Sequence, residues 1–213
     1  MSNPQKPTSP YSRNNPERKP ALPKKSSVKP PDPWEIPAES GDTGQISIFT
    51  SVGRALSFWE TYEGQLSVLF TRFITLNRDS LAARRAFSAV RTHEGRIQML
   101  QAAAEAYFTY FPDDNLKIAF NSLIGRGMNL VKLRNNIAHG VVAPYPNNAT
   151  ETPKDNGFVL MPSYANMKDR HINELPKFFY VSSQIDQITM EFNLLLIPLS
   201  IIIHTITMKD YIR

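Results

Sequence analysis

The stretch NLKIAFNSLIGRGMNLVKLRNNIAHG, residues 115–140, decides the fold of this chain. Apolar residues recur along one face of it: Phe120, Leu123, Leu130, Ile137 and Ala138. This spacing is typical of an amphipathic helix. Asp113 or Asp114 can cap the start of the helix, and Gly140 can end it. We therefore predict a helix over about 115–139 that packs against other helices in a bundle.

Three further segments carry the same helical pattern. They span about 46–76, about 80–111, and from Ser182 or Ser183 to about 209. The stretch 141–177 holds five prolines and several polar clusters, which is typical of irregular structure. Within it we expect a short strand at 157–161 that forms a hairpin with 177–181. The expected fold is all-α: a bundle of four to five helices with an irregular insertion before the last helix.

The N-terminal residues have a different composition. Residues 1–37 contain ten of the 17 prolines and few apolar side chains, so they cannot bury enough surface to offset the entropy lost on folding. We expect a disordered tail over 1–43 and a helical domain over 44–213. Residues 1–37 carry seven Lys/Arg against three Asp/Glu, whereas the rest of the chain carries 17 against 16. The tail is then either a solvated linker or a loose, charge-based contact to a polyanion.

Composition also limits the chemistry and the compartment. The chain has no cysteine, which excludes disulfides, thiolate zinc sites and a cysteine nucleophile. Its histidines lack the spacing of a metal site, so we expect no metal and no cofactor. No secretory signal is visible at the N-terminus, and we expect a cytoplasmic protein.

The last helix has an apolar centre at 194–203. This run is shorter than the roughly 20 residues that span a bilayer, and Pro198 interrupts it. We expect no membrane contact. A helix that is apolar on all sides is typically buried between other helices or at a subunit interface.

Three residues near the end of the 115–139 helix carry the candidate chemistry: Arg134, Asn135 and His139. Arginine binds phosphate, and histidine transfers protons near neutral pH. At about 100° per residue, Arg134 lies within the apolar stripe. Asn135 and His139 are four residues apart and share a face beside that stripe.

An arginine in an apolar stripe needs an acidic partner, because an unpaired buried charge is destabilising. Glu63 is the expected partner, since it too lies in an apolar stripe, and its neighbour Glu60 is the weaker candidate. A purely structural role is an equal alternative for these residues. Histidine is favoured at a helix C-terminus, and arginine often pairs with a carboxylate outside functional sites.

The string Arg134-Asn135-Asn136-Ile137-Ala138-His139 resembles the R-x-x-x-x-H signature of the HEPN superfamily. In that family a polar residue, often Asn, follows the arginine, and the motif ends a helix in a four- or five-helix bundle. The resemblance covers about residues 46–209, but only these six residues are specific.

The resemblance implies a metal-independent endoribonuclease in which the RNA 2′-hydroxyl attacks the adjacent phosphorus. His139 would move the proton, and Arg134 would bind the phosphate. Asn135 would orient the phosphate or the imidazole of His139. Family members commonly form homodimers in which two motifs face one cleft, and many act in toxin–antitoxin or anti-phage defence. An RNA substrate, a second copy and an antitoxin or regulatory protein are therefore the expected partners. The alternatives are a non-catalytic HEPN-like binding module and a helical scaffold.

Overall fold

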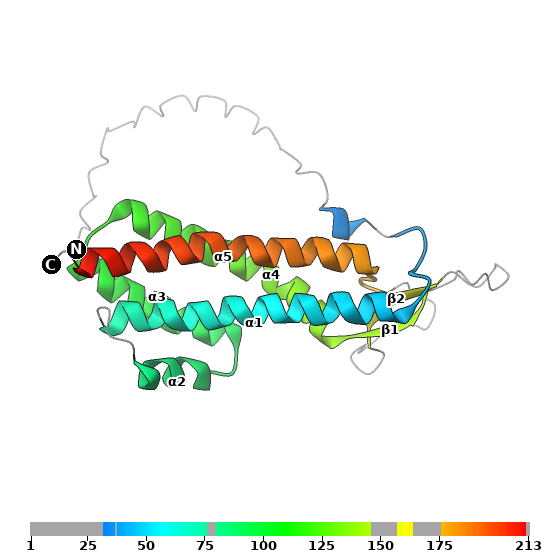
Figure 1. The fold of residues 1–213 in the computed structure, drawn as a ribbon, viewed down its shortest axis with the longest axis horizontal. Helices are drawn as coiled ribbons and strands as arrows, with labels where there is room; N and C mark the ends of the chain where they lie inside the picture. The colour runs from blue at the N-terminus through cyan, green and yellow to red at the C-terminus, as the bar shows by residue number, and fades with distance from the viewer. Residues whose placement is uncertain (1–31, 37, 76–79, 146–156, 164–175, 212–213) are drawn as a thin grey trace, which may run out of the picture. The chain divides into compact units, whose positions relative to one another are not determined.

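The computed structural model describes residues 32–36, 38–75, 80–145, 157–163 and 176–211. The expected disorder of the tail therefore falls, up to residue 31, outside the described residues. The described chain is mostly helical, as predicted (Figure 1). Its elements are a 3-10 helix η1 (Pro33–Glu35), helices α1 (Gln45–Thr75), α2 (Leu81–Ala89), α3 (His93–Tyr110), α4 (Asp114–His139) and α5 (Ser182–Tyr211), and strands β1 (Gly140–Pro144) and β2 (Phe158–Pro162).

The two longest helices, α1 and α5, lie side by side and run in the same direction (Figure 1). Trp59 of α1 packs on Phe192 of α5, with ring centroids 5.1 Å apart. Helix α4 runs antiparallel to α5. Arg126 near the middle of α4 pairs with Glu191 at 2.9 Å, so α4 lies along the α1–α5 pair.

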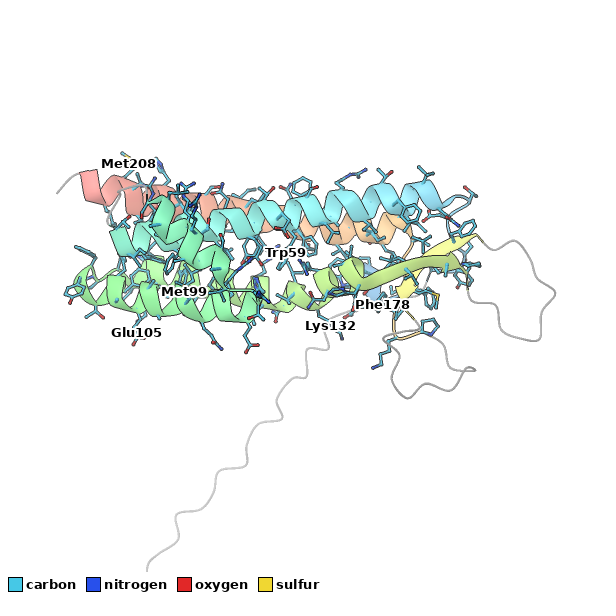
Figure 2. The ribbon with its side chains drawn as sticks, turned by 90° about the horizontal axis from the view of Figure 1, so that it is seen from below. Trp59, Met99, Glu105, Lys132, Phe178 and Met208 are labelled. Carbon is cyan, nitrogen blue, oxygen red and sulfur yellow. The ribbon has the colours of Figure 1, made fainter. Side chains whose placement is uncertain are left out.

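The core lies between α1, α3, α4 and α5. It is built from large apolar side chains that these helices contribute at helical spacing, and Figure 2 shows Trp59 in the interior. Trp59 and Tyr62 are almost completely buried, so both belong to the core. Gly127 of α4 packs directly on Tyr62, because a Cβ at Gly127 would lie 2.3 Å from the Tyr62 hydroxyl.

The predicted helix over 80–111 is in fact two helices. Helix α2 ends at Ala89, and the backbone of the next residue, Val90, is extended. Helix α3 starts after Thr92, whose side chain accepts a hydrogen bond from Gly95 N. The Arg96 side chain then reaches back and donates from Nε to Val90 O at 2.8 Å. A threonine cap within an otherwise apolar pattern was the signal for this break.

The small hairpin before the last helix contains the predicted strand near 157–161, but its second strand is not the predicted one. Strand β2 pairs antiparallel with β1, which directly follows α4, and not with 177–181. From the predicted partner segment only Tyr180 joins, through an isolated bridge to Leu160. Gly140 is extended (φ −74°, ψ 160°), so the chain passes from α4 into β1 without a loop.

The folded part begins earlier than the predicted boundary at residue 44. Asp42 accepts hydrogen bonds from the Ser182 backbone and hydroxyl at 2.7 and 2.8 Å. Gln184 donates to Ile36 O at 2.7 Å. These bonds hold Ile36 and Asp42 against the start of α5, and the low hydrophobicity of the described residues before α1 hides their contribution to the fold.

Helix α5 continues through Pro198 to its predicted end. Among the described residues it is the one helix that is long and apolar enough to cross a membrane, over Ser182–Lys209. About a third of the residues in its most apolar stretch are buried inside the structure. Its inner face fills the core, while a second set of apolar side chains on the opposite face is exposed.

Candidate functional site

The predicted site residues lie on the last two turns of α4, which stays helical as far as His139. The end of this helix is held in place by its neighbours. Asn136 donates from Nδ2 to the Tyr180 hydroxyl at 3.0 Å. A Cβ at Gly140 would lie 2.7 Å from Leu160 Cγ, so only glycine allows β2 to approach this closely. The hairpin and Tyr180 therefore fix the position of the motif.

Burial raises the pKa of Tyr180, and its hydrogen bond with Asn136 acts in the opposite sense. The hydroxyl therefore keeps its proton at neutral pH. The Asn136–Tyr180 contact is a neutral hydrogen bond and positions the helix end without adding charge near the motif.

The Arg134 guanidinium lies at the edge of the bundle. Its Nη1 donates to Asn135 Oδ1 at 3.2 Å, and its Nη2 lies 3.7 Å from Glu60 Oε1. The Arg134 side chain is 29% exposed, and that of Glu60 is 69% exposed. A long ion pair with such an exposed partner is worth little, about 0–1 kcal/mol. An anion from solvent can therefore compete with Glu60 for the guanidinium.

Asn135 and His139 are both exposed and lie one turn apart on the same side of α4. Within the described residues the His139 side chain makes no hydrogen bond or ion pair. Arg134 Nε is buried and has no hydrogen-bond partner there. The end of α4 thus presents an accessible imidazole beside a guanidinium and an amide that contact each other.

Glu63 does not pair with Arg134 as expected. Its carboxylate accepts hydrogen bonds from His93 Nδ1 at 2.6 Å, Arg96 Nη1 at 2.9 Å and Trp59 Nε1 at 3.2 Å. The partner of Arg134 is Glu60, the weaker of the two predicted candidates. Glu63 is therefore a member of a separate buried cluster, in which its carboxylate is bonded by residues of α1 and α3.

The contacts in this buried cluster shift the pKa values of Glu63 and Tyr62. Burial alone would raise the pKa of Glu63, but the hydrogen bonds and charges of His93 and Arg96 outweigh it and hold the pKa below its ordinary value. The pKa of Tyr62, one residue away, is raised because its hydroxyl is buried and lies near the Glu63 charge. The Tyr62 hydroxyl and His93 Nε2 are buried without a hydrogen-bond partner in the described chain.

The role of His93 as a partner of Glu63 was not predicted from the sequence. The missed signal was the break at residues 90–92. It makes His93 the first residue of α3 and places Arg96 one turn later on the same face. Within the described ranges no group of three or more His, Cys, Asp or Glu residues could hold a metal ion.

Comparisons of the chain with models of protein families, with curated proteins and with solved structures gave no match.

Proposed function

We propose that this protein is a metal-independent endoribonuclease of the HEPN type, with its active site at the C-terminal end of α4. The observation that carries the proposal is the exposed His139 imidazole one turn from the Arg134–Asn135 pair. A proton-transfer group and a phosphate-binding group close together are the parts that metal-free RNA cleavage needs.

Each residue has a defined part in the proposed reaction. His139 removes the proton from an RNA 2′-hydroxyl, whose oxygen attacks the adjacent phosphorus. The bond from phosphorus to the 5′-oxygen breaks, and that oxygen takes up a proton. The products are a 2′,3′-cyclic phosphate and a 5′-hydroxyl. The Arg134 guanidinium binds the non-bridging phosphate oxygens and stabilises the charge that builds on them.

The weak pair with Glu60 supports this use of Arg134. Glu60 restrains the guanidinium at the surface in the absence of RNA, and a phosphate replaces it without breaking a buried ion pair. Asn135, already hydrogen-bonded to Arg134, orients the guanidinium during the exchange. A second copy of the chain, whose His139 faces the same cleft, would supply the proton for the leaving oxygen.

Cleavage of a mixed-sequence RNA by the purified full chain in EDTA tests the proposal. We expect His139→Ala to reduce cleavage by about 100-fold or more. Asn129→Ala, an exposed residue on the same helix, is the matched control and should cleave as the unchanged chain does. Cleavage that needs a divalent metal, or that survives His139→Ala, would rule out this mechanism.

A non-catalytic binding module is the second candidate, and one observation favours it. The Arg134 side chain is 29% exposed and only loosely paired with Glu60, so its guanidinium can bind a phosphate without any proton transfer by His139. If the same preparation binds RNA without cutting it, and Arg134→Ala weakens that binding, the binding module is the correct function.

A further inference from the structure

Helix α4 has positive charge along most of its length. After Asp114, its first residue, it contains Lys and Arg side chains but no Asp or Glu. Its two arginines are paired with other helices: Arg126 with Glu191 at 2.9 Å, and Arg134 loosely with Glu60 at 3.7 Å. The two lysines of α4 are therefore the cations that the described part of the fold leaves without a partner.

Lys132 is the lysine that lies near the candidate active site. Its side chain is exposed, and among the described residues it makes no hydrogen bond or ion pair. Figure 2 shows it at the outer edge of α4. Lys132 precedes His139 by almost two full turns, so the two side chains lie within about 20° of each other around the helix axis. Along the axis they are separated by about 10 Å.

Lys132, Asn135 and His139 form one exposed row on this face of α4. They follow one another at spacings of three and four residues, which places each on the next turn of the same face. No acidic side chain of α4 interrupts the row. Ammonium, amide and imidazole groups can all donate hydrogen bonds to phosphate oxygens. The row can therefore follow the backbone of a polynucleotide, whose negative charges recur at every nucleotide.

We propose that Lys132 binds a second phosphate of the RNA, on the same strand as the phosphate that is cleaved. This inference rests on the proposed function, in which Arg134 and His139 hold the cleaved phosphate. The ammonium of Lys132 lies on a flexible stem about two turns away, so it meets a neighbouring phosphate. The substrate is then an RNA oligonucleotide with at least two phosphates, and a single phosphodiester fills only part of the site.

The second phosphate takes no part in the reaction. Its charge is the same before and during cleavage, so the contact with Lys132 stabilises the bound RNA and the transition state equally. Such a contact lowers KM and leaves kcat unchanged. We expect its loss to change KM by about fivefold, because an exposed charge pair is worth little more than that.

Cleavage of two RNA substrates in EDTA tests the inference. One is a dinucleoside monophosphate, which contains only the cleaved phosphate, and the other is a tetranucleotide of mixed sequence. We expect Lys132→Gln to raise KM for the tetranucleotide about fivefold with kcat unchanged, and to leave KM for the dinucleoside monophosphate as it was.

Lys117→Gln is the matched control, since Lys117 is an exposed lysine on the same helix about 22 Å from Lys132. It should cleave both substrates as the unchanged chain does. Equal effects of Lys132→Gln on the two substrates, or no effect on the tetranucleotide, overturn the inference.

RNA binding measured against salt concentration separates this inference from the proposed function. In the His139→Ala background, where the RNA stays intact, adding Lys132→Gln should reduce the slope of log affinity against log salt by about 0.7, the value for one contact to a single strand. An unchanged slope overturns the second phosphate contact. If the unchanged chain binds RNA without cutting it and Lys132→Gln reduces the slope, the ribonuclease proposal fails and the phosphate contact stands. An unchanged chain that does not bind RNA overturns both.

Discussion

Arg134 is the residue whose surroundings connect the sequence pattern to the proposed chemistry. Its position in an apolar stripe predicted an acidic partner, and the structure supplies one, although the partner is Glu60 and not Glu63. The difference matters. A buried pair with Glu63 would hold the guanidinium inside the bundle, whereas the long pair with an exposed Glu60 leaves it available to a phosphate.

Replacing Arg134 with alanine should impair RNA cleavage more than it impairs folding. We expect cleavage to fall by about 100-fold or more, since a donor to the developing phosphate charge is lost. The melting temperature should change little, because the pair with Glu60 is exposed. Arg85→Ala, an exposed arginine on α2, is the control. An equal loss of cleavage in both variants would mean that only general positive charge is needed.

Glu63, unlike Arg134, should matter for stability, since it is buried and its carboxylate accepts hydrogen bonds from Trp59, His93 and Arg96. Glu63→Gln leaves Arg96 without its carboxylate partner, and we expect it to lower the free energy of unfolding by about 3 kcal/mol. Urea unfolding measures this difference. Glu94→Gln, an exposed position in the first turn of α3, should be nearly neutral. A Glu63→Gln variant as stable as the unchanged chain would show that the cluster contributes nothing.

The same carboxylate predicts a pH dependence. Its pKa in the folded chain lies below its ordinary value of 4.5, so the folded state binds the proton less tightly than the unfolded state does. Its stabilising contribution is complete above pH 4.5 and is lost as the pH falls through the lower folded pKa. Between these values Glu63→Gln should lose less stability with acidification than the unchanged chain, as measured by urea unfolding at each pH.

At the scale of elements, the helices were predictable because their apolar residues repeat over many turns. The start of α1, the cap at Asp113 and the extent of α5 agree with the predictions. The break before α3 was missed because three residues interrupt the pattern without disturbing its period. The partner of β2 was missed because β1 starts at Gly140, directly after the end of α4 at His139, so no turn residues separate the helix from the strand.

The same limit applies to the candidate site. Helical geometry placed Asn135 and His139 on one face and Arg134 within the apolar stripe, since these relations are local. The choice between Glu60 and Glu63 depends on how α1 is rotated against α3 and α4. That rotation is set by contacts such as Tyr62 on Gly127, which no local pattern reports.

The α1–α4 contact can be tested at Gly127. An alanine there places its Cβ 2.3 Å from the Tyr62 hydroxyl, and we expect destabilisation of about 1–3 kcal/mol. Tyr62→Phe removes that oxygen and should recover part of the loss in the double variant. Gly125→Ala meets nothing within 4 Å and should stabilise the chain by about 0.5–1 kcal/mol. Equal effects of the two alanines, measured by thermal unfolding, would contradict this packing.

At the scale of the whole molecule, the candidate active site lies at the end of α4, where the hairpin and Tyr180 hold the helix in place. His139→Ala should therefore alter cleavage without changing the fold of the bundle, because the imidazole is exposed.

The identity of the RNA ends produced in EDTA tests the central claim most directly. The account predicts that the unchanged chain yields 2′,3′-cyclic phosphate and 5′-hydroxyl ends, and that His139→Ala, folded and of unchanged mass, yields neither above background. Products with 5′-phosphate ends, or cyclic phosphate ends from the His139→Ala variant at the unchanged rate, would contradict it.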